Sequence, residues 1–275
     1  MRNRTFITII LVIIIIPLGN YLYLWSQGSL LIEGRIKGSQ STEYKDARLN
    51  ELLAKAIPSK GKWSVYIQDL DSQQEIIFNE HQRMEGASTL KLLTARTLQE
   101  LISEGKFDLT KDVGGPVSDH LHLMVNLSDN NSWNTLNSLV TFDKMAQTSY
   151  LLNMKDTNIF DNTTSAHDIG LLLRDIYLTS KTDGTAKFIL NNMKNTETEG
   201  RIPAAFPGVT VYHKSGTYDA HIHDAGIVAM DHPFILVIFS EGLSKEQAEP
   251  LMRELAQNIQ KIISSSDFGR GTIFN

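Results

Sequence analysis

The sequence predicts an α+β fold whose central feature is one antiparallel sheet of five strands, built from both ends of the chain. Two segments with strand-like alternation lie within residues 63–78, and three more lie within 209–239. The chain between them has the apolar spacing of helices, and a further helix is predicted at each end of this order. We therefore expect terminal helices that flank the sheet, with an all-helical subdomain inserted at about residues 92–200.

The first elements of the domain are a helix, a hairpin and a second helix. Leu49, Leu52 and Leu53 lie on one face of the first helix, which Pro58 and Gly61 end. Polar residues then form a turn between two short strands. The predicted elements are a helix at 42–57, strands at 63–67 and 75–78, and a helix that begins at Ser88 and ends before Gly105.

After this second helix, the chain is mostly helical until the last three strands. An apolar pattern through Leu121 is interrupted by a polar triplet and resumes through Leu139. Asp224 is expected to form a turn before a strand. The later predicted elements are helices at 142–152, 165–178 (opened by Thr163 and Thr164) and 186–193, strands at 209–213, 225–230 and 234–239, and a helix from Lys245 to about Ile263.

The first 25 residues differ from the rest of the chain. Arg2 and Arg4 precede an uncharged run from Phe6 to Trp25, which as a helix would span about 30 Å, the thickness of the hydrocarbon core of a bilayer. Arginines on the amino side, with none just beyond the run, predict that this end stays in the cytoplasm and that the remainder is exported. Aromatic residues at the end of the run favour an uncleaved membrane anchor, with a cleaved signal peptide as the alternative.

Composition sets the remaining boundaries. Residues 26–41 are rich in Gly and Ser and predict a linker, so we expect the folded domain at 42–265 and a tail at 266–275.

Of the 275 residues 41% are hydrophobic and none is cysteine, which fits one domain with a substantial core and excludes disulfides. Beyond residue 25 there are 24 basic and 31 acidic side chains, a formal charge of −7 that argues against a nucleic-acid partner. We expect a monomer.

Ser88 and Lys91 form the first candidate catalytic motif. Residues three apart lie on one face of a helix, so the Lys91 amine can reach the Ser88 hydroxyl. The N–H groups at the start of a helix favour negative charge that develops on a bound substrate. Taken alone, the motif is more typical of a serine cap with a surface lysine. A second Ser-x-x-Lys, from Ser59 to Lys62, lies in a Pro/Gly turn where we expect a solvated loop.

Two further polar motifs interrupt apolar elements. Ser128–Asn130 breaks a helical pattern, so it forms either a helix junction or part of a site to which it supplies a hydroxyl and an amide. Lys214–Thr217, with the sequence Lys-Ser-Gly-Thr, ends a predicted strand. With Ser88–Lys91, these motifs resemble in identity and order the three motifs of the class A serine beta-lactamases and the related penicillin-binding D,D-peptidases. The resemblance covers about residues 42–265.

This resemblance implies a beta-lactamase/transpeptidase-like fold and a role for each motif residue. Ser88 would attack a beta-lactam or an acyl-D-Ala-D-Ala peptide and form an acyl-enzyme. Lys91 would be the base for acylation, with a pKa lowered by burial and by the nearby Lys214, and Ser128 would pass a proton to the leaving nitrogen. The other implied groups are Asn130, Ser215, Gly216 and Thr217 as substrate-binding residues and the backbone N–H groups of Ser88 and Thr217 as the oxyanion hole. No cofactor or metal is expected.

One part of the family pattern is missing. Class A beta-lactamases carry a long loop with a Glu-x-x-x-Asn element, whose glutamate activates the deacylating water. Here residues 153–162 lead directly into Thr163 and contain no glutamate, and we expect Asp156 and Asp161 to be too short to replace it. Acylation of Ser88 is therefore expected, with slow deacylation. The alternatives are a D,D-carboxypeptidase or penicillin-binding protein of peptidoglycan metabolism, and a non-catalytic sensor that binds beta-lactam or peptidoglycan.

Two histidine pairs are candidates for metal ligands or binding groups. His120 with His122, and His221 with His223, have the spacing of some metal sites, but the chain has no cysteine and neither pair has an acidic partner at ligand spacing, so we expect loop or surface histidines. The family often has an arginine on the strands after the third motif to meet the substrate carboxylate. Residues 218–239 contain none, and His221 or His223 is the candidate replacement.

Overall fold

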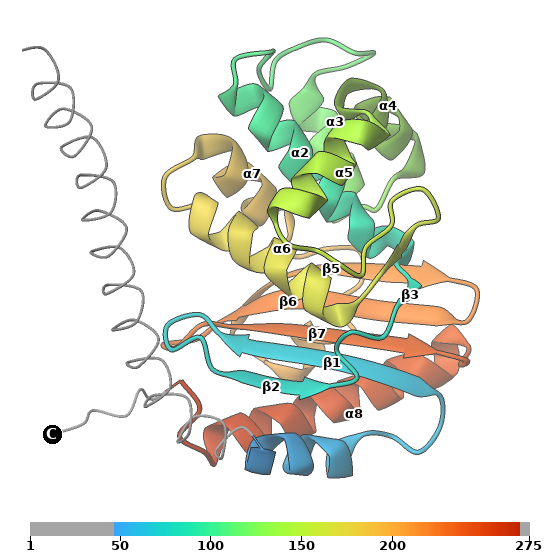
Figure 1. The fold of residues 1–275 in the computed structure, drawn as a ribbon, viewed down its shortest axis with the longest axis vertical. Helices are drawn as coiled ribbons and strands as arrows, with labels where there is room; N and C mark the ends of the chain where they lie inside the picture. Colours follow the sequence, from blue (N-terminus) through green and yellow to red (C-terminus); the bar gives the residue numbers. More distant parts are fainter. Residues whose placement is uncertain (1–46, 270–275) are drawn as a thin grey trace, which may run out of the picture. The chain divides into compact units, whose positions relative to one another are not determined.

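The structure, a computed structural model, describes residues 47–269. At its centre is a sheet of five strands in the order β2-β1-β7-β6-β5, in which every neighbouring pair is antiparallel (Figure 1). The strands are β1 (Lys62–Asp69), β2 (Glu75–Phe78), β5 (Thr210–Tyr218), β6 (His221–Ala229) and β7 (Phe234–Glu241). The predicted fold class, with one antiparallel sheet built from both ends of the chain, is thus confirmed.

Helices cover both faces of this sheet (Figure 1). On one face lie α8 (Lys245–Ser264) and a helix whose described part spans residues 47–56. On the other face, α6 (Ala166–Thr179) packs on β1, β6 and β7. The helices beyond α6 form the helical subdomain, and they are α2 (Lys91–Ser103), α3 (Val117–Asn126), α4 (Asn130–Val140), α5 (Phe142–Leu151) and α7 (Gly184–Asn192).

Alternate residues of the central strand β7 belong to two different cores. Ile235, Val237 and Phe239 pack with residues of the helical subdomain, whereas Leu236 and Ile238 pack with residues of α8. Each side chain is fully buried, and burying one of this size contributes about 1.5–3 kcal/mol. Both faces of the strand are therefore covered, which explains why its sequence is continuously apolar.

The first two motifs lie at the ends of helices. Ser88 is in a 3-10 turn, η1 (Ala87–Leu90), and α2 begins only at Lys91. The polar triplet is a helix junction, because Ser128 has a φ of +57° and the Asp129 side chain caps α4 by accepting the N–H of Ser132. The helix predicted through this stretch is therefore two helices, α3 and α4.

Three predicted element boundaries are wrong. Strand β5 continues to Tyr218 rather than ending at residue 213, so Lys214–Thr217 lies inside it. Thr163 and Thr164 do not open α6 but form the short strand β4 (Thr163–Thr164), which pairs with β3 (Met84–Glu85), and Ser165 caps α6 instead. Strand β6 begins at His221 rather than at residue 225, so Asp224 lies inside a strand and not in a turn. In the second and third cases strand pairing overrides the local preference of polar residues, between the distant β3 and β4 in the second and between β6 and its sequence neighbours β5 and β7 in the third.

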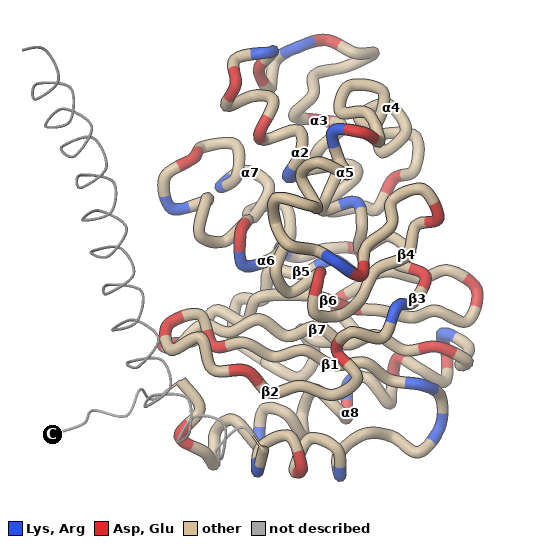
Figure 2. Tube along the Cα trace, viewed as in Figure 1, with Lys and Arg blue, Asp and Glu red and all other residues tan. Residues whose placement is uncertain are grey.

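Within residues 47–269, no helix is both long enough and apolar enough to cross a membrane. The predicted anchor or signal segment at 1–25, the linker at 26–41 and the last six residues of the chain lie outside the described residues. Acidic and basic residues are interspersed along the described chain, over the sheet as well as the helices (Figure 2).

Candidate active site

The three predicted motifs meet where the sheet borders the helical subdomain. Lys91 Nζ lies 2.7 Å from Asn130 Oδ1 and 3.4 Å from Ser128 Oγ, and it also donates to the Ser128 carbonyl. Lys214 Nζ, which comes from β5, lies 2.8 Å from the same Ser128 Oγ. Two buried lysines thus converge on one hydroxyl, an arrangement that can pass protons between the three groups.

Strand β5 brings this cluster to Ser88. A Cβ atom on Gly216 would lie only 3.2 Å from the backbone N of Ser88 and 3.1 Å from Ala87 Cβ, so glycine allows β5 to run against η1. The two segments that carry the expected oxyanion-hole N–H groups, those of Ser88 and Thr217, are therefore adjacent. Since β5 is an edge strand of the sheet, its outer side can pair with an extended substrate.

The residue before the predicted nucleophile, Ser88, has an unusual backbone. Ala87 has a φ of +48°, in the left-handed region that costs a non-glycine residue about 1–3 kcal/mol. The Asn162 side-chain amide holds this residue in place, because its Nδ2 donates to the Ala87 carbonyl at 3.3 Å and to the Glu85 carboxylate. No role was predicted for Glu85, since its partner lies 77 residues away in sequence.

Burial changes the acid–base properties of both lysines. It lowers the pKa of Lys91 to about 8. Burial and then the positive charge of Lys91 lower the pKa of Lys214 to about 7. The lowered pKa of Lys91 agrees with the expectation from the sequence. The expected repulsion between the two lysines, however, lowers the pKa of Lys214 and not that of Lys91. Near neutral pH, a neutral amine is thus available to accept a hydroxyl proton.

Arg201, for which the sequence indicates no role, is buried behind the third motif. Its Nη1 donates to the carbonyls of Gly216 and His223, at 3.0 and 2.6 Å. Its Nη2 donates to Thr217 Oγ1 at 2.7 Å, and Nε donates to Glu249. Arg201 therefore places a positive charge next to the Thr217 hydroxyl, a predicted substrate-binding group. This arginine comes from the segment before β5, whereas the family often has one on the strands that follow the third motif.

His223 cannot replace an arginine at the substrate. The side chain is fully buried, its Nε2 lies 2.7 Å from the Glu85 carbonyl, and its ring stacks on Phe239. Burial lowers the pKa of His223 to about 3, so the ring is neutral. The expectation of a loop or surface histidine is wrong here, because β6 begins four residues earlier than predicted and this position faces the core.

Asp224 is a buried structural acid. Its carboxylate accepts from His213 Nδ1 at 2.8 Å and from the N–H of Ile202 at 3.0 Å. Burial lowers the pKa of His213, but the charges of Asp224 and Glu199 outweigh it and raise this pKa to about 9. An imidazolium–carboxylate pair therefore lies directly behind Lys214.

The other predicted histidine pair does not converge. His120 Nδ1 lies 3.1 Å from Ser132 Oγ, whereas His122 Nδ1 lies 2.7 Å from Asn192 Oδ1. The two rings thus have different partners and do not form a metal site together.

The carboxylates of the short loop at residues 152–162 are engaged away from the nucleophile. Asp161 accepts from the Thr163 hydroxyl at 2.6 Å, and this bond lowers the pKa of its carboxyl group. Asp156 accepts from the Ser165 hydroxyl at 3.0 Å. Within residues 47–269, no hydrogen bond joins either carboxylate to Ser88.

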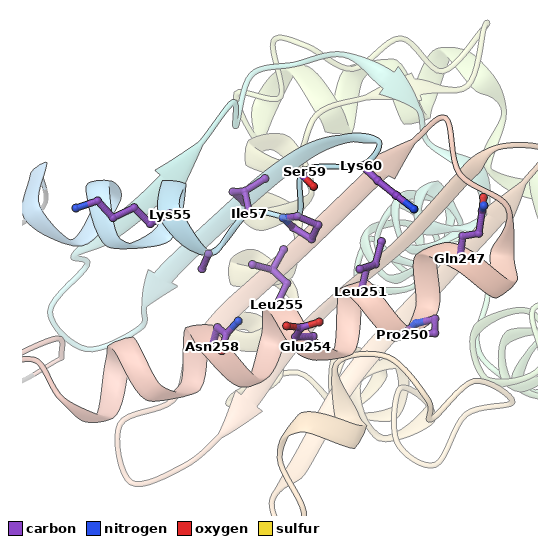
Figure 3. Close-up of a pocket in the computed structure, with 12 residues that line it drawn as sticks. Lys55, Ile57, Ser59, Lys60, Gln247, Pro250, Leu251, Glu254, Leu255 and Asn258 are labelled. Carbon is purple, nitrogen blue, oxygen red and sulfur yellow. The ribbon is translucent and has the colours of Figure 1, made fainter.

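The second Ser-x-x-Lys lies on the other face of the sheet. Ser59 lines a groove of about 600 Å³ between the chain at residues 55–60 and α8 (Figure 3). Lys62 forms an exposed ion pair with Glu241 at 2.9 Å. This copy is therefore a surface turn, as the sequence predicts, and its residues are suitable controls for those of the first motif.

Fold and site together define a protein of the serine beta-lactamase/transpeptidase-like superfamily. The model of the beta-lactamase enzyme family matches residues 45–263, so the chain belongs to this family. No curated protein matches the sequence.

Solved structures agree on the fold. PBP-A has a TM-score of 0.71 and 19% identity, over 81% of this chain and 97% of that chain. The TLA-1 extended-spectrum beta-lactamase has a TM-score of 0.73 and 18% identity, over 80% and 99%. A mutant of PBP-A, described as an acyl-enzyme complex with penicillin G, has a TM-score of 0.70 and 18% identity, over 82% and 97%.

Proposed function

We propose that this protein is a serine hydrolase that forms an acyl-enzyme at Ser88 with beta-lactam or acyl-D-Ala-D-Ala substrates and hydrolyses that intermediate slowly. The observation that carries the proposal is the convergence of Lys91 and Lys214 on the Ser128 hydroxyl, beside the turn that holds Ser88. The penicillin G acyl-enzyme described for a PBP-A mutant of similar fold supports the same chemistry.

In the proposed acylation step, Lys91, Ser128 and the backbone N–H groups of the oxyanion hole each have one role. Neutral Lys91 accepts the Ser88 proton while Ser88 Oγ bonds to the substrate carbonyl carbon, and the carbonyl oxygen takes up negative charge. The N–H groups of Ser88 and Thr217 stabilise this oxyanion, a contribution of roughly 3–4 kcal/mol for one donor in well-studied cases. When the C–N bond breaks, the Ser128 hydroxyl gives its proton to the leaving nitrogen and is reprotonated from the lysines.

Substrate binding follows from the edge of the sheet. An extended acyl-amide can lie along β5 beside Gly216, with its side-chain amide held by Asn130. The positive charge of Lys214 and the hydroxyls of Ser215 and Thr217 would meet its carboxylate, and Arg201 would orient the Thr217 hydroxyl.

Slow deacylation follows from the short loop. Hydrolysis of the ester needs a base that activates water. The Thr163 hydrogen bond makes Asp161 less basic, and Asp156 is engaged with Ser165, so neither is placed for this task. The same observation favours one alternative, a D,D-carboxypeptidase or penicillin-binding protein that acts on peptidoglycan stem peptides and is inhibited by beta-lactams. A sensor that is acylated without turnover is the third possibility.

We also propose that the catalytic domain acts outside the cytoplasmic membrane as a monomer. The support for this location is the apolar segment at residues 1–25, with two arginines on its amino side and no basic residue just beyond it. Peptidoglycan and beta-lactams are both met in that compartment, so this location suits each proposed substrate.

The test is intact-mass spectrometry of the full-length protein mixed with penicillin G and followed over time. We expect one adduct per chain that persists, that is absent from Ser88→Ala, and that forms normally in the matched control Ser59→Ala. Many turnovers with little adduct would show an efficient beta-lactamase and contradict slow deacylation. Absence of both adduct and turnover would refute the acyl-enzyme proposal for penicillins.

A further inference from the structure

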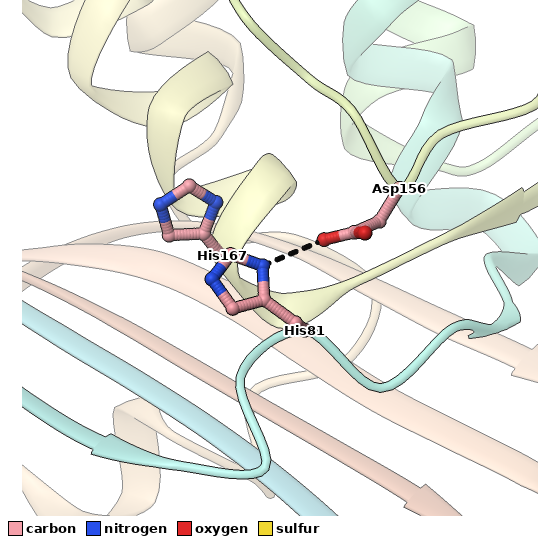
Figure 4. A group of neighbouring side chains, drawn as sticks. All are labelled: His81, Asp156 and His167. Carbon is pink, nitrogen blue, oxygen red and sulfur yellow. Dashed lines mark hydrogen bonds and ion pairs between the residues drawn. The ribbon is translucent and has the colours of Figure 1, made fainter.

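Outside the catalytic cluster, two imidazoles and one carboxylate meet at the base of the short loop. They belong to His81, Asp156 and His167, and one potential ligand atom of each lies within 4.8 Å of the other two (Figure 4). His81 precedes β3, Asp156 lies in the loop at 152–162, and His167 is in the first turn of α6. Sequence spacing could not reveal this group, because His81 and Asp156 are 75 residues apart.

The donor set suits a borderline-soft divalent metal ion. Zn²⁺ binds histidine nitrogens at about 2.0–2.1 Å and carboxylate oxygens at about 2.0–2.2 Å, so donor atoms around a tetrahedral ion lie about 3.3–3.5 Å apart. His81 Nδ1 and Asp156 Oδ2 form a hydrogen bond of 2.8 Å, so an ion would replace this bond and separate the two atoms by about 0.5 Å. The ring centroids of His81 and His167 are 4.5 Å apart. Since the His81 side chain is 60% exposed, a small rotation can bring the three donors around one ion and leave the fourth position to water.

A buried carboxylate orients two of the three ligands. Asp168 Oδ2 accepts from the N–H of Asp156 at 2.7 Å and from the Thr157 hydroxyl at 2.8 Å, and its Oδ1 lies 3.3 Å from His167 Nδ1. Within the described residues, His167 Nε2 forms no hydrogen bond. Metal-binding histidines usually donate their other ring nitrogen to a carboxylate in this way, which fixes the ring and strengthens its donor atom. The Ser165 hydroxyl also restrains the Asp156 carboxylate.

We propose that His81, Asp156 and His167 bind one Zn²⁺ ion. Such an ion joins three segments, two of which lead to the nucleophile. One continues through β3 into Gly86 and Ser88, and the other ends at Asn162, whose amide holds Ala87. The ion would therefore fasten the short loop to the turn that carries Ser88. This inference does not depend on the proposed acyl-enzyme chemistry.

The test is calorimetric titration of the chelator-treated, full-length protein with ZnSO₄, using protein that carries no polyhistidine tag. We expect one Zn²⁺ per chain and, at a hundredfold excess over the Kd, a rise in Tm of about 5 °C or more. His81→Ala should weaken binding at least about tenfold without loss of folding, since this side chain is 60% exposed. His167→Asn should weaken binding similarly.

His232→Ala is the matched control. His232 is 56% exposed and lies 3.5 Å from a single carboxylate, that of Asp71, so it tests whether any exposed histidine–aspartate pair binds zinc. Its affinity should equal that of the unaltered protein. Co²⁺ gives a second readout, because a four-coordinate site gives visible absorption bands that should be present in the His232→Ala variant and absent from His81→Ala. Absence of stoichiometric binding, or equal binding by His81→Ala and the unaltered protein, would overturn the proposal.

Discussion

The two sides of Ser88 differ in the state of their charged groups. Towards α2 and β5, Lys91 and Lys214 are buried and share the Ser128 hydroxyl, and within the described residues neither forms an ion pair. Towards the short loop, Asp156 and Asp161 are tied to neighbouring hydroxyls and to His81. A buried cation without a counter-ion has a lowered pKa and can exchange protons, whereas a hydrogen-bonded carboxylate mainly holds structure. In the proposed function, the groups for acylation thus lie on one side of Ser88, while the carboxylates on the other side fasten the loop.

The largest expected effect is the loss of the acylation base. Lys91→Met keeps the volume of the side chain and removes the amine, so the second-order rate constant for acylation by a fluorescent penicillin should fall about 10²–10⁴-fold. Lys62→Met, in the exposed second Ser-x-x-Lys, should leave this rate unchanged. Acylation of Lys91→Met at the normal rate would show that the buried lysine is not the base.

The next effect is on stability behind Lys214. Asp224→Asn keeps the shape of the side chain but leaves the His213 imidazolium without its buried partner, and we expect the free energy of unfolding in urea to fall by about 3–5 kcal/mol. The exposed Asp161→Asn should change it by less than about 0.5 kcal/mol. Because the pKa of His213 is raised to about 9, its contribution is complete below about pH 6.5 and is lost as the pH rises through 9. A stability difference between unaltered protein and Asp224→Asn that stayed constant from pH 6 to 10 would contradict this account.

A third effect is the pH dependence of acylation. With the pKa of Lys91 at about 8, the neutral fraction of this amine rises about 50-fold between pH 6 and pH 8. The acylation rate should rise with it and level off above pH 9, as measured by stopped-flow mixing with the same penicillin. A rate that is flat over this range would mean that the lysines exchange no proton in the rate-limiting step.

The smallest expected effect concerns the loop carboxylates. Asp156→Asn and Asp161→Asn should each leave the rate at which the penicilloyl adduct disappears within about twofold of the unaltered protein, because neither carboxylate serves as the base. Time-resolved intact-mass spectra measure this rate directly. A tenfold slower loss in either variant would identify a deacylation base and erase the contrast between the two sides of Ser88.

The features that could be predicted from the sequence are those that depend on a local pattern of residues. The periodicity of residues 63–78 and 209–239 predicts the five strands, and the three motifs predict the residues that meet around Ser128. Each motif is short enough to be recognised in the sequence, and the family resemblance predicts that the three meet. Spacing alone would not suffice, since Ser88–Lys91 spans η1 and α2, and Ser128–Asn130 lies at the junction of α3 and α4.

Contacts between distant segments could not be predicted in this way. The hydrogen bonds of Asn162 to Glu85 and of Arg201 to Thr217 depend on how distant elements pack, and the periodicity of the sequence contains no information on that packing.

Asp224 shows a second kind of error. Aspartate is rare in strands, so a turn was predicted, but the charge of His213 and the N–H of Ile202 stabilise this carboxylate inside the sheet.

The order of strands also determines when the protein can fold. Strand β7, the last in sequence, lies at the centre of the sheet and pairs with β1, so that Lys62 is opposite Glu241 although 179 residues separate them. Contacts of such long range slow folding, because a large loop must close before any pairing energy is gained. The hairpin of β1 and β2 and the helical subdomain therefore cannot complete their packing until the last strand, β7, is available. Nearly the whole chain must therefore be synthesised before the sheet beside Ser88 is complete, and we expect a truncation before residue 234 to remove its central strand.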